Sequence, residues 1–189
     1  MPNEETAVVL DYLPSGKSSS FKSDPIAQVI GKEFFTLLEI IPKSPLKTIE
    51  EVYVGKEERD KVQYIKKRIF FDDLTNNSMA EIEKAIEKII LSEPKRFIDF
   101  FNNARPITIR MHQLELLPGL GKKHMFNILK EREKKPFESF EGLAKRVNLM
   151  PNPVNLLVKR IMLELGEPSL KHYLFVRPPS KQDEFRKGR

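Results

Sequence analysis

The chain has 189 residues, 40% of them apolar, and carries 33 Lys and Arg against 27 Asp and Glu, a formal net charge of +6. Cysteine and tryptophan are absent, which excludes disulfide frameworks, thiol nucleophiles and thiolate metal sites. No apolar run reaches the ~18–20 residues of a membrane span, and the first residues lack the basic start and apolar stretch of a signal peptide. We therefore expect a folded protein of one or two domains with no membrane partner.

The positive charge is confined to the C-terminal part of the chain. Residues 1–104 hold 15 Lys and Arg and 18 Asp and Glu, whereas residues 105–189 hold 18 and 9. This asymmetry indicates two modules, the second of which suits a polyanionic partner. A solvated basic surface without an acidic partner is the alternative.

Residues 1–76 are predicted to form a small antiparallel β-barrel. Short runs rich in apolar, β-branched and aromatic residues, separated by turn signals, occupy residues 6–10, 26–30, 34–41, 51–54 and 62–69. No helical crossover separates these runs, which favours antiparallel pairing. An OB-like barrel is one candidate.

Residues 77–104 are predicted to form connecting helices. Ser78 and Glu81 have the spacing of a capping box, and apolar residues recur after them on one helix face. Ser92 can cap a second helix that has Pro94 in its first turn. Together with the barrel and the helices further along the chain, these segments predict an α+β fold.

Residues 105–176 are predicted to be helical with two tight turns, and residues 177–189 to be a flexible basic tail. The first turn reads Leu-Pro-Gly-Leu-Gly-Lys-Lys at residues 117–123. Gly119 allows a sharp reversal, Leu120 can fill the space between two helices, and Gly121 lets a ligand approach the backbone. The backbone amides that follow begin a helix, where they have no partners within the helix and suit a phosphate.

This turn resembles the helix-hairpin-helix motif of DNA- and RNA-binding proteins. The resemblance implies phosphate contacts through backbone amides and lysine side chains of Gly119, Leu120, Gly121, Lys122 and Lys123. In some such motifs the hairpin carbonyls, here those of Leu117 and Leu120, bind a monovalent cation. A helical turn that merely needs glycine is the alternative.

A second, divergent hairpin is predicted after the first. Ser139 can cap a short helix, residues 148–153 would form the turn, and apolar residues then recur at helical spacing up to Gly166. In paired motifs of this kind, two hairpins pack pseudo-symmetrically and can straddle a duplex. This turn has no glycine, so a packing role is at least as well supported as a phosphate contact. Lys159 and Arg160 are candidate backbone contacts.

Lys17 and His124 are secondary candidates for a phosphate contact. Lys17 lies in a segment similar to the end of a phosphate loop, but Asp11 stands where that motif needs its first glycine, so nucleotide hydrolysis is not expected. The three histidines lack ligand spacing, so we expect neither a metal nor a cofactor. Asp72 and Asp73 are more typical of a turn than of a catalytic pair.

Aromatic side chains of the predicted barrel could stack on unpaired bases. These side chains are Tyr12, Phe34, Phe35, Tyr53 and Tyr64. Phe34 and Phe35 are adjacent and would point to opposite faces of a strand, so one of them should lie in the core. We expect most of the five to be core residues.

The chain resembles an archaeal family called domain of unknown function 655. The resemblance rests on residues 11–14, 25–28 and 35–39 and on the order of barrel and hairpins, and it covers residues ~6–178. It implies an OB-like barrel followed by helix-hairpin-helix repeats, nucleic-acid or nucleotide binding, and a cytoplasmic archaeal origin. It implies no catalytic residues.

The expected function is non-enzymatic binding of nucleic acid through backbone phosphates, with RNA slightly favoured over DNA. A protein-interaction module of a translation or repair assembly is the main alternative. A metal-dependent nuclease using Asp11, Asp72 or Asp73 is a third and weaker one.

Overall fold

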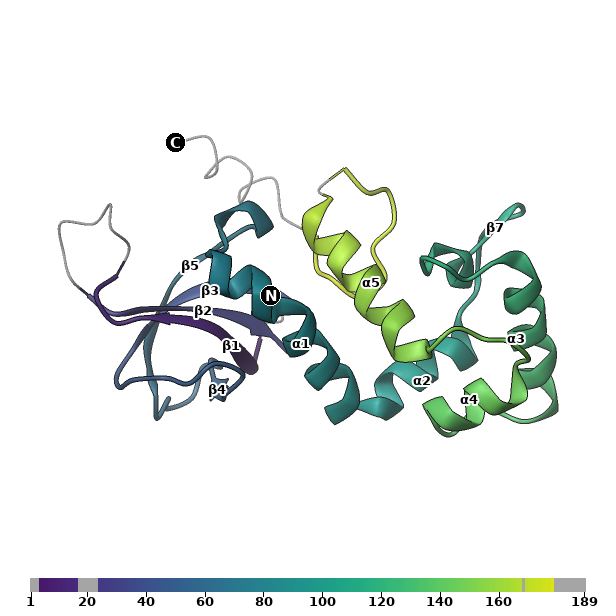
Figure 1. Ribbon diagram of the computed structural model, residues 1–189, viewed down its shortest axis with the longest axis horizontal. Helices are drawn as coiled ribbons and strands as arrows, with labels where there is room; N and C mark the ends of the chain where they lie inside the picture. Colours follow the sequence, from purple (N-terminus) through teal and green to yellow (C-terminus); the bar gives the residue numbers. More distant parts are fainter. Residues whose placement is uncertain (1–3, 17–23, 168, 179–189) are drawn as a thin grey trace. The chain divides into compact units, whose positions relative to one another are not determined.

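The computed structural model describes residues 4–16, 24–167 and 169–178. The chain forms two compact units (Figure 1), one built from residues 1–85 and 164–189 and the other from residues 86–163. The borders between the units fall inside the helices at residues 76–92 and 153–166, and the domain bounds expected at residues 76, 104 and 176 stay predictions.

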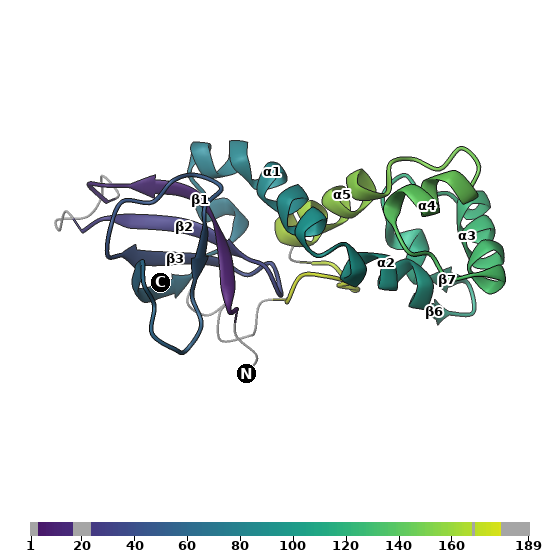
Figure 2. The same cartoon turned by 90° about the horizontal axis from the view of Figure 1, so that it is seen from below.

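The first unit is built on a five-stranded antiparallel sheet. Its strands are β1 (Thr6–Leu13), β2 (Ile26–Gly31), β3 (Leu37–Pro42), β4 (Glu51–Tyr53) and β5 (Val62–Arg68). They follow the order β4-β1-β2-β3-β5, and β1, β2 and β3 lie side by side in Figure 2. The sheet curls into a half-barrel whose edges are β4 and β5. The α+β fold with an N-terminal barrel-like sheet is thereby confirmed.

One face of this sheet encloses an apolar core. Successive strand residues point to opposite faces, so alternate positions share this core. It comprises Ala7, Val9, Ala27, Val29, Leu38, Ile40, Leu46, Val52, Val54 and Val62, with Tyr12 and Ile65 packed against it.

Helix α1 (Asn76–Ser92) begins on a buried polar cluster of the sheet. Gln28, which is 0% exposed, donates from Nε2 to the carbonyl of Asp73 at 2.9 Å and accepts from the amide of Thr75 and the hydroxyl of Ser78. Thr75 Oγ1 accepts the amide of Ser78 at 3.0 Å and donates to Asp11 at 2.7 Å. The predicted cap at Ser78 is therefore wrong, because Thr75 caps the helix and the Ser78 hydroxyl bonds the sheet instead.

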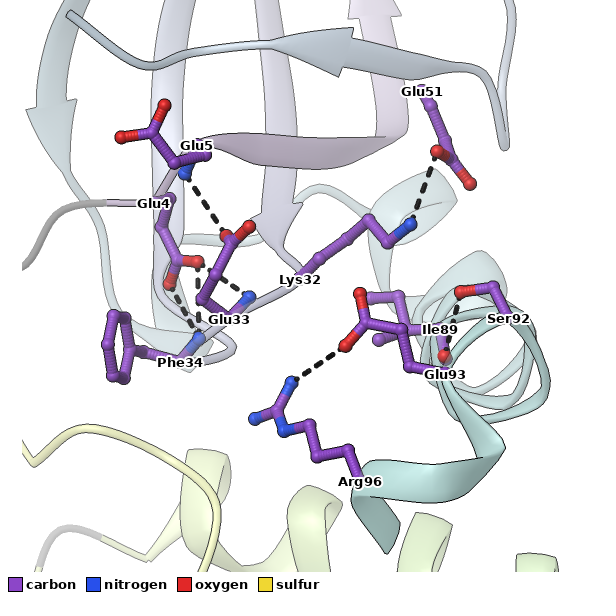
Figure 3. A network of polar contacts seen from close by, with 10 residues as sticks. All are labelled: Glu4, Glu5, Lys32, Glu33, Phe34, Glu51, Ile89, Ser92, Glu93 and Arg96. Atoms are coloured by element: carbon purple, nitrogen blue, oxygen red, sulfur yellow. Dashed lines mark hydrogen bonds and ion pairs between the residues drawn. The ribbon is translucent and has the colours of Figure 1, made fainter.

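The turn between β2 and β3 closes around the carboxylate of Glu4 (Figure 3). This carboxylate accepts the amides of Glu33, Phe34 and Thr36 at 2.9, 3.1 and 2.9 Å. Phe34 and Phe35 therefore belong to a turn and not to the predicted strand. Phe35 has a φ of 54° and is fully buried, which confirms that one of the pair is a core residue.

The chain returns to the first unit at its C-terminal end. The Glu164 carboxylate accepts the amides of Leu174, Phe175 and Val176 at 2.7–3.0 Å. The Arg177 amide donates to the Phe34 carbonyl at 3.1 Å. Arg177, the first residue of the predicted tail, is thus bonded to the first unit, whereas residues 179–189 lie outside the described part of the chain and the tail stays a prediction.

The second unit holds most of the helices. These are the C-terminal half of α1, α2 (Pro94–Asn103), α3 (Lys122–Lys134), α4 (Phe140–Arg146) and all of α5 (Pro153–Gly166) except its last three residues. The prediction that the helical region begins at residue 105 is wrong. β6 (Pro106–Thr108) and β7 (Met111–His112) form a hairpin there, followed by the 3₁₀-helix η2 (Gln113–Leu116). β-Branched residues at 107–109 favour extended backbone over a helix.

Part-buried hydrogen bonds tie α2 to α3 and to the segment before α4 in the second unit. The Arg132 guanidinium donates to the carbonyls of Phe101 and Ala104 at 3.1 and 2.9 Å. The Asn102 side chain both accepts from and donates to the backbone of Phe137. These bonds hold α2, α3 and the start of the α4 region around an apolar core and fix the position of α3. None of the helices in the described residues is long and apolar enough to cross a membrane.

Candidate nucleic-acid interface

The segment between η2 and α3 makes a sharp turn that depends on one glycine. Gly119 has a φ of +92°, a conformation that residues with a Cβ rarely adopt. The Leu120 amide donates to the Leu117 carbonyl at 3.0 Å, and the Leu120 side chain is only 5% exposed. The reversal and the apolar plug predicted from the sequence are thus both present.

Gly121 is the N-cap residue of α3 and leaves the first turn of this helix uncapped. Its φ of −76° and ψ of 164° are open to any residue, and a Cβ added there would meet nothing within 4 Å. Within the described residues, no hydrogen-bond acceptor is assigned to the amides of Gly121, Lys122, Lys123 and His124. Neither the backbone nor the packing requires glycine here, yet its presence keeps these amides open to solvent.

In contrast to α3, the helices α4 and α5 are capped at their N-termini by side chains. Ser139 Oγ accepts the amide of Gly142 at 3.0 Å and caps α4. Asn152 Oδ1 accepts the amides of Val154 and Asn155 at 2.9 and 3.2 Å and caps α5. The second hairpin therefore has its amides occupied by its own side chain, and only the first hairpin offers them to a ligand.

Two exposed lysines flank the open amides. Lys122 and Lys123 are the first residues of α3, and no ion pair to either is found among the described residues. Lys134 and Lys135 at the other end of the helix are paired, with Glu131 at 2.5 Å and Glu138 at 3.0 Å. The positive end of the helix dipole and these two side chains favour an anion at the same place.

The two hairpins lie side by side. His124 Nε2 donates to the Leu149 carbonyl in the second turn at 2.9 Å, and a Cβ on Gly119 would lie 3.5 Å from the Leu156 side chain. Arg160 is 3% exposed and donates to the Leu116 carbonyl at 3.1 Å. His124 and Arg160 therefore join the hairpins, and the burial of Arg160 argues against its candidate contact with a backbone phosphate.

The other predicted contacts fall in different environments. Lys159 is exposed on α5, and Lys17 lies outside the described residues. The Leu117 carbonyl, one of the two proposed cation ligands, accepts the Leu120 amide. Asp72 and Asp73 lie in the 3₁₀-helix η1 (Phe71–Asp73), as expected for a turn. The described residues contain no group of three or more His, Asp and Glu suited to a metal ion.

Phe126 was not among the candidates predicted from the sequence, because stacking aromatic residues were expected on the barrel. Phe126 is 61% exposed on α3. Its spacing of four and three residues from Lys122 and Lys123 was the available signal, since such residues share a helix face. Among the barrel aromatics, Tyr64 is 47% exposed, and the hydroxyl of Tyr53 is bonded to Glu5.

His112 was also missed, as a structural residue of the hairpin. Its Nδ1 accepts the amide of Leu114 at 3.1 Å, and its own amide donates to Glu115. Burial, followed by the charge of Arg132, lowers the pKa of His112. The neutral ring therefore caps η2, the element that leads into the open turn.

Three comparisons relate this chain to known proteins. A family model described as "Protein of unknown function (DUF655)" matches residues 3–177. Uncharacterized protein MJ0038 of Methanocaldococcus jannaschii is 41% identical over 177 residues, 92% of this chain and 80% of that protein. The crystal structure of Af1531 from Archaeoglobus fulgidus matches with a TM-score of 0.86 at 44% identity, covering 92% of this chain and 100% of that one. Both relatives are archaeal, and neither name states a ligand or reaction.

Proposed function

The chain belongs to the DUF655 family of proteins of unknown function, and we propose that its first hairpin binds the phosphate backbone of nucleic acid, RNA foremost, without reading sequence. The observation that carries this proposal is the open N-terminus of α3 at Gly121, beside Lys122 and Lys123. We also propose a helix-hairpin-helix pairing of the two turns and a cytoplasmic location, which the family resemblance implies.

The chemistry of the open turn fits a phosphodiester. Backbone amides at a helix N-terminus donate to anionic oxygens, and such charge-assisted bonds are about twice as strong as neutral ones. Lysine side chains add attraction but no base recognition, because phosphates carry no sequence information. The second hairpin then serves as a support, since Asn152 occupies its amides and His124 ties it to α3.

The test is the salt dependence of binding to a single-stranded RNA and to an RNA or DNA duplex. Each phosphate contact contributes about 0.7 to the slope of log K against log salt for single strands and about 0.9 for duplex DNA. We expect the Lys122→Ala/Lys123→Ala variant to bind every sequence more weakly, with a slope shallower by about 1.4 to 1.8.

Lys134→Ala/Lys135→Ala is the matched control. It removes the same charge at the other end of α3, from lysines that are paired with Glu131 and Glu138. We expect a clearly smaller change of slope for this variant. An equal change in both variants would show general attraction to a basic surface, and an unchanged slope in the first would refute the proposed contact. Partners that survive nuclease treatment in a pull-down would favour a protein-interaction module instead.

A further inference from the structure

The solvent-exposed face of α3 carries a large apolar side chain that is not part of the buried core. Phe126 is 61% exposed and is the only phenylalanine of the described residues among the exposed large hydrophobic side chains. No aromatic or cation–π contact to its ring is found within the described chain. Met125 and Ile128, at 6% and 0% exposure, already supply the buried face of this helix.

Lysines surround Phe126 along the helix. Lys122 and Lys123 lie four and three residues before it, and Lys130 lies four residues after it. Residues at these spacings share one face of a helix, with about 5–6 Å between their Cβ atoms. All three lysines are exposed, and within α3 the acidic residue at a matching spacing is Glu133, seven residues after Phe126. The exposed ring of Phe126 is therefore flanked on both sides along the helix by positively charged side chains.

An aromatic ring among cations matches a ligand that combines a flat apolar face with phosphates. An unpaired nucleotide has both, because its base can stack on the ring while the flanking phosphates contact lysines. Within a duplex, by contrast, neighbouring bases cover both faces of each base. Gly121 lies five residues before Phe126, a rise of about 7.5 Å along the helix. One strand can therefore contact both the open amides and the ring.

We propose that Phe126 stacks on an unpaired base, so that the preferred ligand is single-stranded nucleic acid or an unpaired loop. This inference rests on the proposed phosphate contact and assigns the strand type that the contact serves. Lys123 and Lys130 hold the backbone on either side of the stacked base. Stacking tolerates any base, which agrees with binding that does not read sequence.

The experiment is a titration of a labelled 12-nucleotide oligouridine, its deoxythymidine counterpart and a 12-base-pair duplex, by fluorescence anisotropy. We expect Phe126→Ala and Phe126→Leu to weaken single-strand binding about 5- to 150-fold, the effect of losing one stacked base. Phe126→Tyr retains the ring and should bind like the wild type. Duplex affinity and the salt slope should stay unchanged, because no charge is removed.

Phe126→Trp gives a direct readout, since the chain has no tryptophan of its own. Its fluorescence should be quenched by the single strand and not by the duplex. Wild-type affinity in the Phe126→Leu variant, or an unquenched tryptophan in a bound complex, would overturn the stacking proposal. A salt slope that still depends on the two lysines would in that case continue to support the proposed phosphate contact. Loss of self-association in Phe126→Ala with unchanged affinity would assign the face to a second copy of the chain and overturn it as well. Absence of any lysine-dependent binding would remove both proposals.

Discussion

Placing a capping side chain at Gly121 should strengthen the fold and abolish the binding site. In Gly121→Asp the new carboxylate can accept the amides of Lys123 and His124, as Asn152 does in the second hairpin. The backbone at Gly121 tolerates a Cβ, which would meet nothing within 4 Å. The change therefore introduces no strain and blocks the amides from within.

The two expected effects have opposite signs. Aspartate in place of an N-cap glycine gains a few tenths of a kcal/mol, and its charge at the helix start adds about 0.3–1 kcal/mol. This corresponds to a rise of about 2–8 °C in the Tm of a unit of this size. Losing one charge-assisted hydrogen bond to phosphate costs about 1.5–3 kcal/mol, a 10- to 150-fold loss of affinity.

Thermal unfolding and anisotropy titration on the same preparations measure the two effects. Gly121→Ser and Gly121→Asn supply caps without charge and separate occupied amides from simple repulsion. Asn152→Asp adds the same charge to the second hairpin, where the amides are already occupied, and should leave affinity nearly unchanged. Full affinity in a stabilised Gly121→Asp variant would refute the role of these amides, and destabilisation by more than about 1 kcal/mol would show that the aspartate does not cap α3.

Two further predictions concern the stability of the fold. Gln28→Leu should destabilise the protein by about 1–3 kcal/mol, because the Asp73 carbonyl and the Thr75 amide lose their bond to Gln28 and the Ser78 hydroxyl keeps only its bond from Thr75. Urea unfolding measures this change, and an unchanged midpoint would contradict it. Because burial lowers the pKa of His112, the unfolded chain takes up the proton first, so stability should fall as pH drops below about 6.5. The His112→Asn variant keeps an acceptor for the Leu114 amide but does not titrate, so it should lose less stability than the wild type between pH 7.5 and pH 5.5. Urea unfolding midpoints at the two pH values measure this loss.

The sequence predicted those elements that depend on residues close together in the chain. The strands follow from short apolar and β-branched runs between turn signals, and the first turn follows from Gly119, whose positive φ the sequence could indicate. Ser78 shows the limit of such reasoning. Its hydroxyl bonds Gln28, which is 50 residues away in the chain, so no local pattern could assign the helix cap to Thr75.

The same distinction between local and distant interactions applies to the residues of the candidate site. The open amides and Lys122 could be located from the sequence, because they lie within one turn of the chain. The burial of Arg160 could not, since its partner is the Leu116 carbonyl 44 residues earlier. Phe126 has a readable spacing, but its exposure depends on which face of α3 the rest of the unit covers.

The return of the chain to Glu164 has a consequence for the order of folding during synthesis. The first unit, which holds the half-barrel, includes residues 164–178, and these are synthesised after the second unit, which ends at residue 163. Domains tend to fold as units while the chain emerges. The second unit can therefore be finished before the first, and the turn that contains Phe34 gains its hydrogen bond from the Arg177 amide only afterwards.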